Sequence, residues 1–158
     1  MKKIVSLLIL LFAFASCTQD VTRNGNSIKA LKDGVLWKPV VTTATMATDG
    51  KLTINALYQN QSLTINTSSA AAGVYAFGTG VTNKATFIYT QDGIDITYVT
   101  GTGVGNGNIT ISDYDVVNKT ITGTFKFNAN TEVVSPDVNP IVNFSQGGFF
   151  KLPVTSGI

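Results

Sequence analysis

Short stretches in which apolar and polar residues alternate recur along most of this chain. The clearest two are Leu52–Leu57 and Ser62–Thr67, which are separated by a polar turn at Gln59–Gln61. Alternation with a period of two places every second side chain on the same face of a β-strand. These two stretches therefore predict a β-hairpin. The side chains predicted to face inward are those of Leu52, Ile54, Ala56, Leu63 and Ile65.

A second hairpin is predicted from residues 85–90 and 94–99, because the intervening Gln91–Gly93 has the composition of a turn. The longest alternation follows at Thr120–Phe127. Gly123 falls on the apolar row of that strand, where a missing side chain leaves room for a neighbouring ring or for a β-bulge. The inward-facing side chains predicted for this strand are Ile121, Phe125 and Phe127.

Strands of this kind recur with turn signals between them from Asp33 onward, and no stretch has the pattern of an amphipathic helix. That combination is typical of an all-β domain. We expect an antiparallel β-sandwich or flattened barrel of about 8–10 strands, largely a meander because several turns are tight. The sequence leaves the choice between an open sandwich and a closed barrel undecided.

The first 16 residues have a different pattern. Two lysines precede a run of about a dozen apolar residues, which is short of the roughly 20 that a membrane-spanning helix needs. The run ends in small residues directly before Cys17, the only cysteine in the chain. Residues 1–16 are therefore predicted to be a helical lipoprotein signal peptide, with cleavage between Ser16 and Cys17.

Cys17 is predicted to carry the lipid, because several acyl chains on one residue, palmitate among them, hold a soluble domain firmly on a membrane. The expected partner is the lipid bilayer, and the expected location is the cell envelope, on the periplasmic face or the surface of an outer membrane. Residues 17–32 are expected to form a flexible tether and 33–158 a single β domain. Two alternatives remain open: a plain cleaved signal that leaves Cys17 as a free thiol, and an uncleaved anchor.

The net charge argues against two classes of partner. The chain has 11 basic and 9 acidic residues, and loss of Lys2 and Lys3 with the signal leaves 9 of each. Nucleic acids and anionic membrane surfaces both require a clustered positive surface, so neither is expected as a partner.

The residue types also limit the chemistry. The chain contains no histidine, and its one cysteine is assigned to lipidation. It therefore lacks the most common general base and metal ligand, a thiol nucleophile and any intramolecular disulfide. We predict that the protein is not an enzyme and carries no metal or other cofactor.

The close carboxylate pairs are Asp92 with Asp95 and Asp113 with Asp115. Such pairs offer the oxygen ligands that Ca²⁺ takes, or the two acids of a glycosidase-like hydrolase. Neither segment matches the known calcium-binding loop pattern, and Glu132 is the only glutamate. The favoured interpretation is that these acids cap turns or face solvent.

Glycines and aromatic residues supply the other candidate sites. Gly101–Gly107 has a composition similar to a phosphate-binding loop, but it lacks the lysine followed by Ser or Thr, so a mobile hairpin loop is predicted. Aromatic side chains could form a binding surface where exposed, although in β domains they more often form cross-strand core pairs. We predict that Trp37 is in the core. The remaining aromatic candidates are Tyr58, Tyr75, Tyr89, Tyr98 and Tyr114.

Three segments carry a family resemblance. They are Gly34–Trp37, the stretch Asn108–Phe127 that ends in Gly-Thr-Phe-Lys-Phe, and Gly147–Phe150. In these segments the chain resembles a family of small Bacteroidota lipoproteins whose domain has no assigned function. The resemblance spans residues 34–152 and implies an all-β domain on a lipid anchor. It implies no catalytic residue.

The leading hypothesis is a membrane-anchored, non-enzymatic β domain that binds a ligand or has a structural role in the envelope. Binding is expected to use loops at one end of the sheet, such as Gly101–Gly107, or an aromatic patch. A second hypothesis is a lipocalin-like carrier with an apolar cavity inside a barrel. A third is a hydrolase that brings aspartates together in one cleft. Its candidate acids are Asp92, Asp95, Asp113 and Asp115.

Overall fold

The computed structural model describes residues 27–157. Its strands are joined in one hydrogen-bonded sheet, so the predicted all-β class is confirmed with slightly more strands than expected. No helix within this range is long and apolar enough to cross a membrane. The strands are β1 (Ser27–Lys32), β2 (Val35–Trp37), β3 (Val41–Met46), β4 (Leu52–Tyr58), β5 (Gln61–Thr67), β6 (Gly73–Phe77), β7 (Lys84–Gln91), β8 (Ile94–Val99), β9 (Asn106–Asp115), β10 (Thr120–Asn130) and β11 (Ile141–Ser156).

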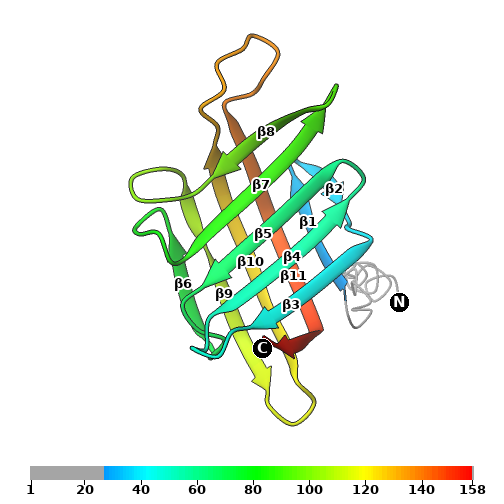
Figure 1. The fold of residues 1–158 in the computed structure, drawn as a ribbon, viewed down its shortest axis with the longest axis vertical. Helices are drawn as coiled ribbons and strands as arrows, with labels where there is room; N and C mark the ends of the chain where they lie inside the picture. Colours follow the sequence, from blue (N-terminus) through cyan, green and yellow to red (C-terminus); the bar gives the residue numbers. More distant parts are fainter. Residues whose placement is uncertain (1–26, 158) are drawn as a thin grey trace, which may run out of the picture.

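The sheet folds over into two layers whose strands cross (Figure 1). One layer contains β3, β4, β5, β7 and β8, and the other contains β2, β1, β11, β10, β9 and β6. Hydrogen bonds join the layers at two corners: the end of β11 pairs with β3 in parallel, and Asn130 of β10 pairs with Val99 of β8. The fold is therefore a flattened, partly closed barrel. The parallel β11–β3 pair departs from the antiparallel arrangement that the sequence predicted.

Both predicted hairpins are confirmed. β4 pairs with β5 along its whole length, and β7 pairs with β8 from Thr86 to the turn. The five side chains predicted to face inward in the first hairpin are all buried. Gln59 and Asp92 have positive φ angles of 53° and 52° in the two turns, as two-residue hairpin turns require.

The sheet begins earlier than the sequence predicted. Ser27–Lys32, which we assigned to the tether, forms β1 and pairs with both β11 and β2. Only Ile28 and Ala30 of this strand are buried, so its alternation is too short to be noticed in a polar stretch. The predicted signal peptide at residues 1–16 and the predicted lipid site at Cys17 lie outside the described residues.

β11 is the longest strand and forms one corner of the barrel. Its pairing with β10 shifts register twice. Gln146 and Lys151 lie at these shifts and have left-handed φ angles of 50° and 46°. Bulges of this kind bend a strand and increase its twist. β11 therefore runs beside β1 first and then meets β3 with its last residues.

Aromatic rings fill the centre of the space between the layers. The Phe144 ring on β11 lies 5.4 Å from the ring of Trp37, 5.2 Å from Phe87 and 4.8 Å from Phe127, measured between ring centres. Trp37 is 2% exposed, which confirms its predicted place in the core. These rings fill the interior of the barrel. A lipocalin-like carrier would need that space for its ligand.

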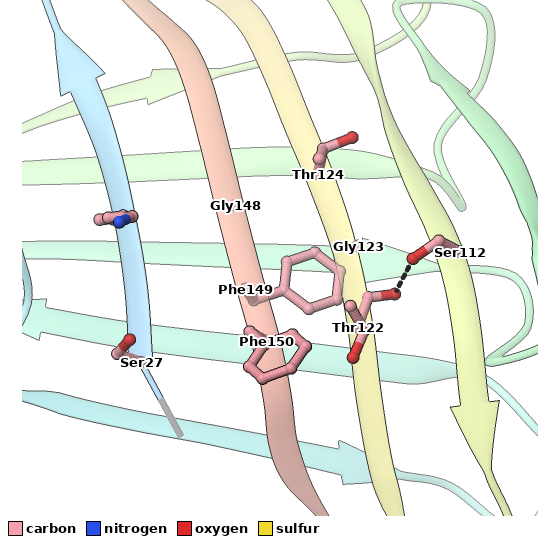
Figure 2. Close-up of a pocket in the computed structure, with 9 residues that line it drawn as sticks. Ser27, Ser112, Thr122, Gly123, Thr124, Gly148, Phe149 and Phe150 are labelled. Carbon is pink, nitrogen blue, oxygen red and sulfur yellow. Dashed lines mark hydrogen bonds between the residues drawn. The ribbon is translucent and has the colours of Figure 1, made fainter. Parts of the chain in front are cut away.

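Gly123 provides the space that the sequence predicted. The Phe149 ring of β11 is directed toward it (Figure 2), and a Cβ at position 123 would lie 2.5 Å from Cζ of Phe149. The register of β10 also shifts beside Gly123 in its pairing with both neighbouring strands. The position therefore has both the neighbouring ring and the bulge.

Candidate functional site

A hollow opens between the two layers at one end of the barrel. The β1–β2 turn, the start of β5, strands β7 and β8 and the β10–β11 loop surround it, and that loop stands at the top of the view in Figure 1. Its volume is about 310 Å³, at the low end for small-molecule sites. We call it the mouth pocket. Its lining residues are Lys32, Asp33, Gln61, Phe87, Tyr89, Gln91, Ile96, Tyr98, Asp137, Val138, Asn139, Ile141 and Val142.

The floor of the mouth pocket is apolar and aromatic. Phe87, Ile96 and Tyr98 are buried there, and the ring centres of Phe87 and Tyr98 are 6.0 Å apart. Residues two apart on a strand share a face, so Tyr89 and Gln91 continue the inner face of β7 from Phe87 toward the opening. The pocket thus changes from a floor of rings to a polar rim.

Lys32 and Asp33 form an ion pair at one wall. Lys32 Nζ lies 3.2 Å from Asp33 Oδ2 and 5.8 Å from the centre of the Phe87 ring. The backbone N–H of Asn143 donates to Asp33 Oδ1 at 2.9 Å. Both carboxylate oxygens of Asp33 are therefore engaged, and the lysine reaches from one layer to a ring of the other.

Tyr98 holds the β10–β11 loop against the pocket. Its hydroxyl donates to the carbonyl oxygen of Asn139 at 2.9 Å. Burial raises the pKa of this hydroxyl, and the negative charge of Asp33 raises it further. The hydroxyl therefore stays protonated at neutral pH and remains a donor. At the base of the loop, the N–H of Thr131 donates to the carbonyl oxygen of Pro140 at 3.0 Å, which brings the two ends of the loop together.

Gln61, the first residue of β5, carries an unpaired polar atom. Its side-chain oxygen is buried and has no hydrogen-bond partner among the described residues. Gln61 is directly opposite Tyr89 on β7, and directly opposed residues have Cβ atoms roughly 4.5–5.5 Å apart. The Gln61 amide therefore lies beside the Tyr89 side chain at the pocket wall. A buried acceptor without a partner costs about 1–3 kcal/mol, a cost that a donor on a ligand would remove.

A second hollow lies on the outer face of the layer that contains β1, β11, β10 and β9 (Figure 2). Ser112 donates to the carbonyl oxygen of Thr122 at 3.1 Å beside it. Its volume is about 130 Å³, less than half that of the mouth pocket. Of these two hollows, the mouth pocket is therefore the stronger candidate. The second hollow is lined by Ser27, Lys29, Ser112, Thr122, Gly123, Thr124, Gly148, Phe149 and Phe150.

The first predicted acid pair lies in the β7–β8 hairpin, outside the lining of the mouth pocket. Asp92 is exposed in the turn. Asp95 accepts a hydrogen bond from the Thr90 hydroxyl at 2.6 Å across the hairpin. Both residues have a place in the hairpin itself, which agrees with the interpretation as turn and solvent-facing acids.

The second pair lies on β9. The backbone N–H groups of Asn118 and Val117 donate to Asp115 Oδ1 at 2.9 and 3.0 Å. These hydrogen bonds lower the pKa of the Asp115 carboxyl, and those from Asn118 have the larger effect. The β7–β8 and β9–β10 turns lie at opposite ends of the molecule (Figure 1), so the four predicted acids do not share a cleft. Nowhere in residues 27–157 do three metal-ligating side chains gather.

Gly101–Gly107 forms a hydrogen-bonded turn. Gly101 and Val104 exchange backbone hydrogen bonds of 2.8 and 2.9 Å, and the N–H of Gly103 donates to the carbonyl oxygen of Gly78 at 2.9 Å. These three N–H groups are already in use, so they cannot cradle a phosphate. The predicted binding role of this loop finds no support in its geometry.

Sequence reasoning found part of the mouth pocket. Tyr89 and Tyr98 were among the aromatic candidates and do line it, whereas Trp37 does not. Gln61 and Gln91 were missed, although they extend the inward-facing rows of β5 and β7. A polar residue at an inward position near a strand end is a signal that could have identified this rim.

The comparison with protein families covers nearly all of this fold. Residues 24–153 match a family described as Domain of unknown function (DUF6252). The chain belongs to this family. The match to DUF6252 begins just before β1 and ends within β11, so it includes all the residues of the mouth pocket. No curated protein and no solved structure gives a significant match to the chain.

Proposed function

We propose that this DUF6252 protein is a lipid-anchored, non-enzymatic binding protein of the cell envelope that takes a small polar ligand into the mouth pocket. The observation that carries the binding role is the unpaired side-chain oxygen of Gln61 at the wall of this hollow. Native proteins rarely leave a buried polar atom without a partner. The resemblance to Bacteroidota lipoproteins supports the anchor, and the open rim of the pocket supports entry of a ligand from solvent.

The position of the tether fits this role. Cys17 precedes Ser27, the first residue of β1, by ten residues, whereas Lys32 and Asp33 at the other end of β1 line the mouth pocket. A strand rises roughly 3.3 Å per residue, so β1 separates the tether from the pocket by about 17 Å. The pocket therefore lies at the end of β1 opposite the end that the tether joins.

The chemistry of the pocket favours binding over catalysis. Asp33 and Asp137 are the carboxylates in its lining. A paired-acid hydrolase needs one carboxyl group that gives up a proton and another that accepts one or attacks the substrate. Asp33 is already held by Lys32 and by the N–H of Asn143, so it is poorly suited to either task.

Replacing Cys17 with alanine is expected to move the protein from the membrane fraction to the soluble fraction and to abolish labelling with radioactive palmitate. The reason is that Cys17 offers the only thiol in the chain for acylation. Immunoblotting of the fractions and autoradiography measure the two effects. Thr18→Ala, a change at the next residue, is the matched control and should leave both unchanged. Persistent labelling of Cys17→Ala would show that the anchor assignment is wrong.

Narrowing the mouth pocket is expected to abolish ligand-dependent stabilisation. A ligand that binds only the folded state raises the melting temperature according to its concentration and affinity. We expect at least one member of a panel of neutral sugars, amines and carboxylates to raise the melting temperature of the full chain. Gln91→Trp at the exposed rim should remove that shift, whereas Val117→Trp in the exposed β9–β10 turn should retain it. Equal shifts in both variants would place binding elsewhere.

A further inference from the structure

The mouth pocket requires hydrogen-bond donors from its ligand. The side-chain oxygen of Gln61 is an unpaired acceptor. Two of the donors nearby are already engaged, since Lys32 pairs with Asp33 and the Tyr98 hydroxyl donates to Asn139. A ligand that brings hydroxyl or N–H groups therefore complements the Gln61 oxygen, whereas one with acceptors alone leaves it unpaired.

The charge of the pocket argues against an anionic ligand. Lys32 and Asp33 neutralise each other, and Asp137 adds a further carboxylate to the rim. An anion would meet this carboxylate without a free cation to offset it. Neutral polyhydroxylated ligands and cationic amines remain.

The aromatic groups favour the neutral class. A cation is bound best over the face of a ring, but the Phe87 ring already has Lys32 Nζ 5.8 Å from its centre. Tyr89 instead lies directly opposite Gln61 across two paired strands. A ring beside an amide suits a sugar, because the C–H face of a pyranose packs on an aromatic ring while its hydroxyl groups point sideways toward polar side chains.

We propose that the ligand is a neutral saccharide of one or two rings, packed on Tyr89, and that the buried side-chain oxygen of Gln61 turns toward the hollow to accept a hydrogen bond from one of its hydroxyl groups. This inference rests on the proposed binding function and names the ligand class for the same pocket. The volume of about 310 Å³ agrees with a ligand of that size, because it is near the lower limit for small-molecule sites.

The test is isothermal titration of the full chain in phosphatidylglycerol vesicles. The saccharide probes are maltose, cellobiose and diacetylchitobiose, and the amine probes are choline and putrescine, each at up to about 10 mM so that millimolar affinity is detected. We expect saturable binding of at least one disaccharide. Tyr89→Ala should weaken it at least tenfold, whereas Tyr89→Phe, which keeps the ring, should retain most of the affinity.

Gln61→Leu separates a binding role from a structural one. This variant should weaken saccharide binding at least tenfold and at the same time raise the melting temperature, because it removes a buried polar atom that lacks a partner. Ser62→Ala, the neighbouring residue on the opposite face of β5, is the control and should change neither quantity. A lower melting temperature for Gln61→Leu would overturn its assignment as the ligand acceptor.

The two proposals fail differently. Binding of choline or putrescine that Tyr89→Ala abolishes, with no saccharide bound, would overturn the saccharide assignment and leave the binding function in place. Saccharide binding that neither Tyr89→Ala nor Gln61→Leu weakens would also overturn the saccharide assignment for this pocket. The absence of binding by every probe, together with no stabilisation by any ligand in the melting panel, would overturn both.

Discussion

Phe144→Ala is expected to lower the free energy of unfolding by about 3–5 kcal/mol. The Phe144 side chain is 0% exposed and its ring packs against Trp37 and Phe127 in its own layer and against Phe87 in the other. Truncation leaves a cavity that the surrounding hydrogen-bonded strands cannot close. The loss is a large part of the roughly 5–15 kcal/mol by which a typical domain is stable. Urea unfolding followed by circular dichroism measures it.

Phe150→Ala is the matched control for this prediction. Phe150 lies on the same strand but is only partly buried and faces the outer side of the layer. Its truncation removes less buried area, so the loss of stability should be clearly smaller. Equal losses for Phe144→Ala and Phe150→Ala would contradict the central place of Phe144 in the core.

Gly123→Ala is expected to cost about 3 kcal/mol or more, at the upper end for overpacking of a core. The added Cβ would lie 2.5 Å from Cζ of Phe149 and would also meet the carbonyl oxygen of Thr110. The Phe149 ring could shift, but the carbonyl belongs to the backbone of β9, which pairs with β10 at this point. Relief therefore requires a change in the sheet itself. Chemical denaturation of the purified variant gives the loss in stability.

Gly148→Ala provides the matched control on the neighbouring strand. A Cβ at position 148 would have its nearest neighbour, the carbonyl oxygen of Gly123, at 3.8 Å, which is an ordinary contact. The stability of this variant should lie within about 0.5 kcal/mol of the original, as for other tolerated surface changes. Similar destabilisation by both substitutions would mean that steric exclusion at Gly123 is not the cause.

Local pattern was sufficient where the pairing partner is adjacent in the sequence. The β4–β5 and β7–β8 hairpins were predicted, the first together with its inward face, because a tight turn sets the register of the strands it connects. β1 pairs with the distant strand β11 along most of its length, and its local partner β2 has only three residues. The local hairpin is therefore a weak signal, and β1 has just two buried residues to show its alternation.

The candidate site was less predictable than the strands. The mouth pocket draws its polar residues from the β1–β2 turn, β5, β7 and the β10–β11 loop. No spacing in the sequence relates these segments, since they meet only when the two layers close at the β11–β3 and β10–β8 corners. The aspartate pairs that are close in sequence lie in separate hairpins, whose turns are at opposite ends of the molecule.

The sequence by itself determined the all-β class, the two hairpins, the buried face of the first hairpin, the core position of Trp37 and the space at Gly123. Each of these depends on neighbouring residues or on the preference of large apolar side chains for burial. Only the tertiary structure decided the closure of the layers, the turn of β11 toward β3 and the meeting of Gln61, Tyr89 and Asp33 in one pocket. The physical reason is that closure depends on bulges and on pairing between distant strands. The contacts that stabilise such pairing form only when the chain folds, so no local pattern in the sequence indicates them.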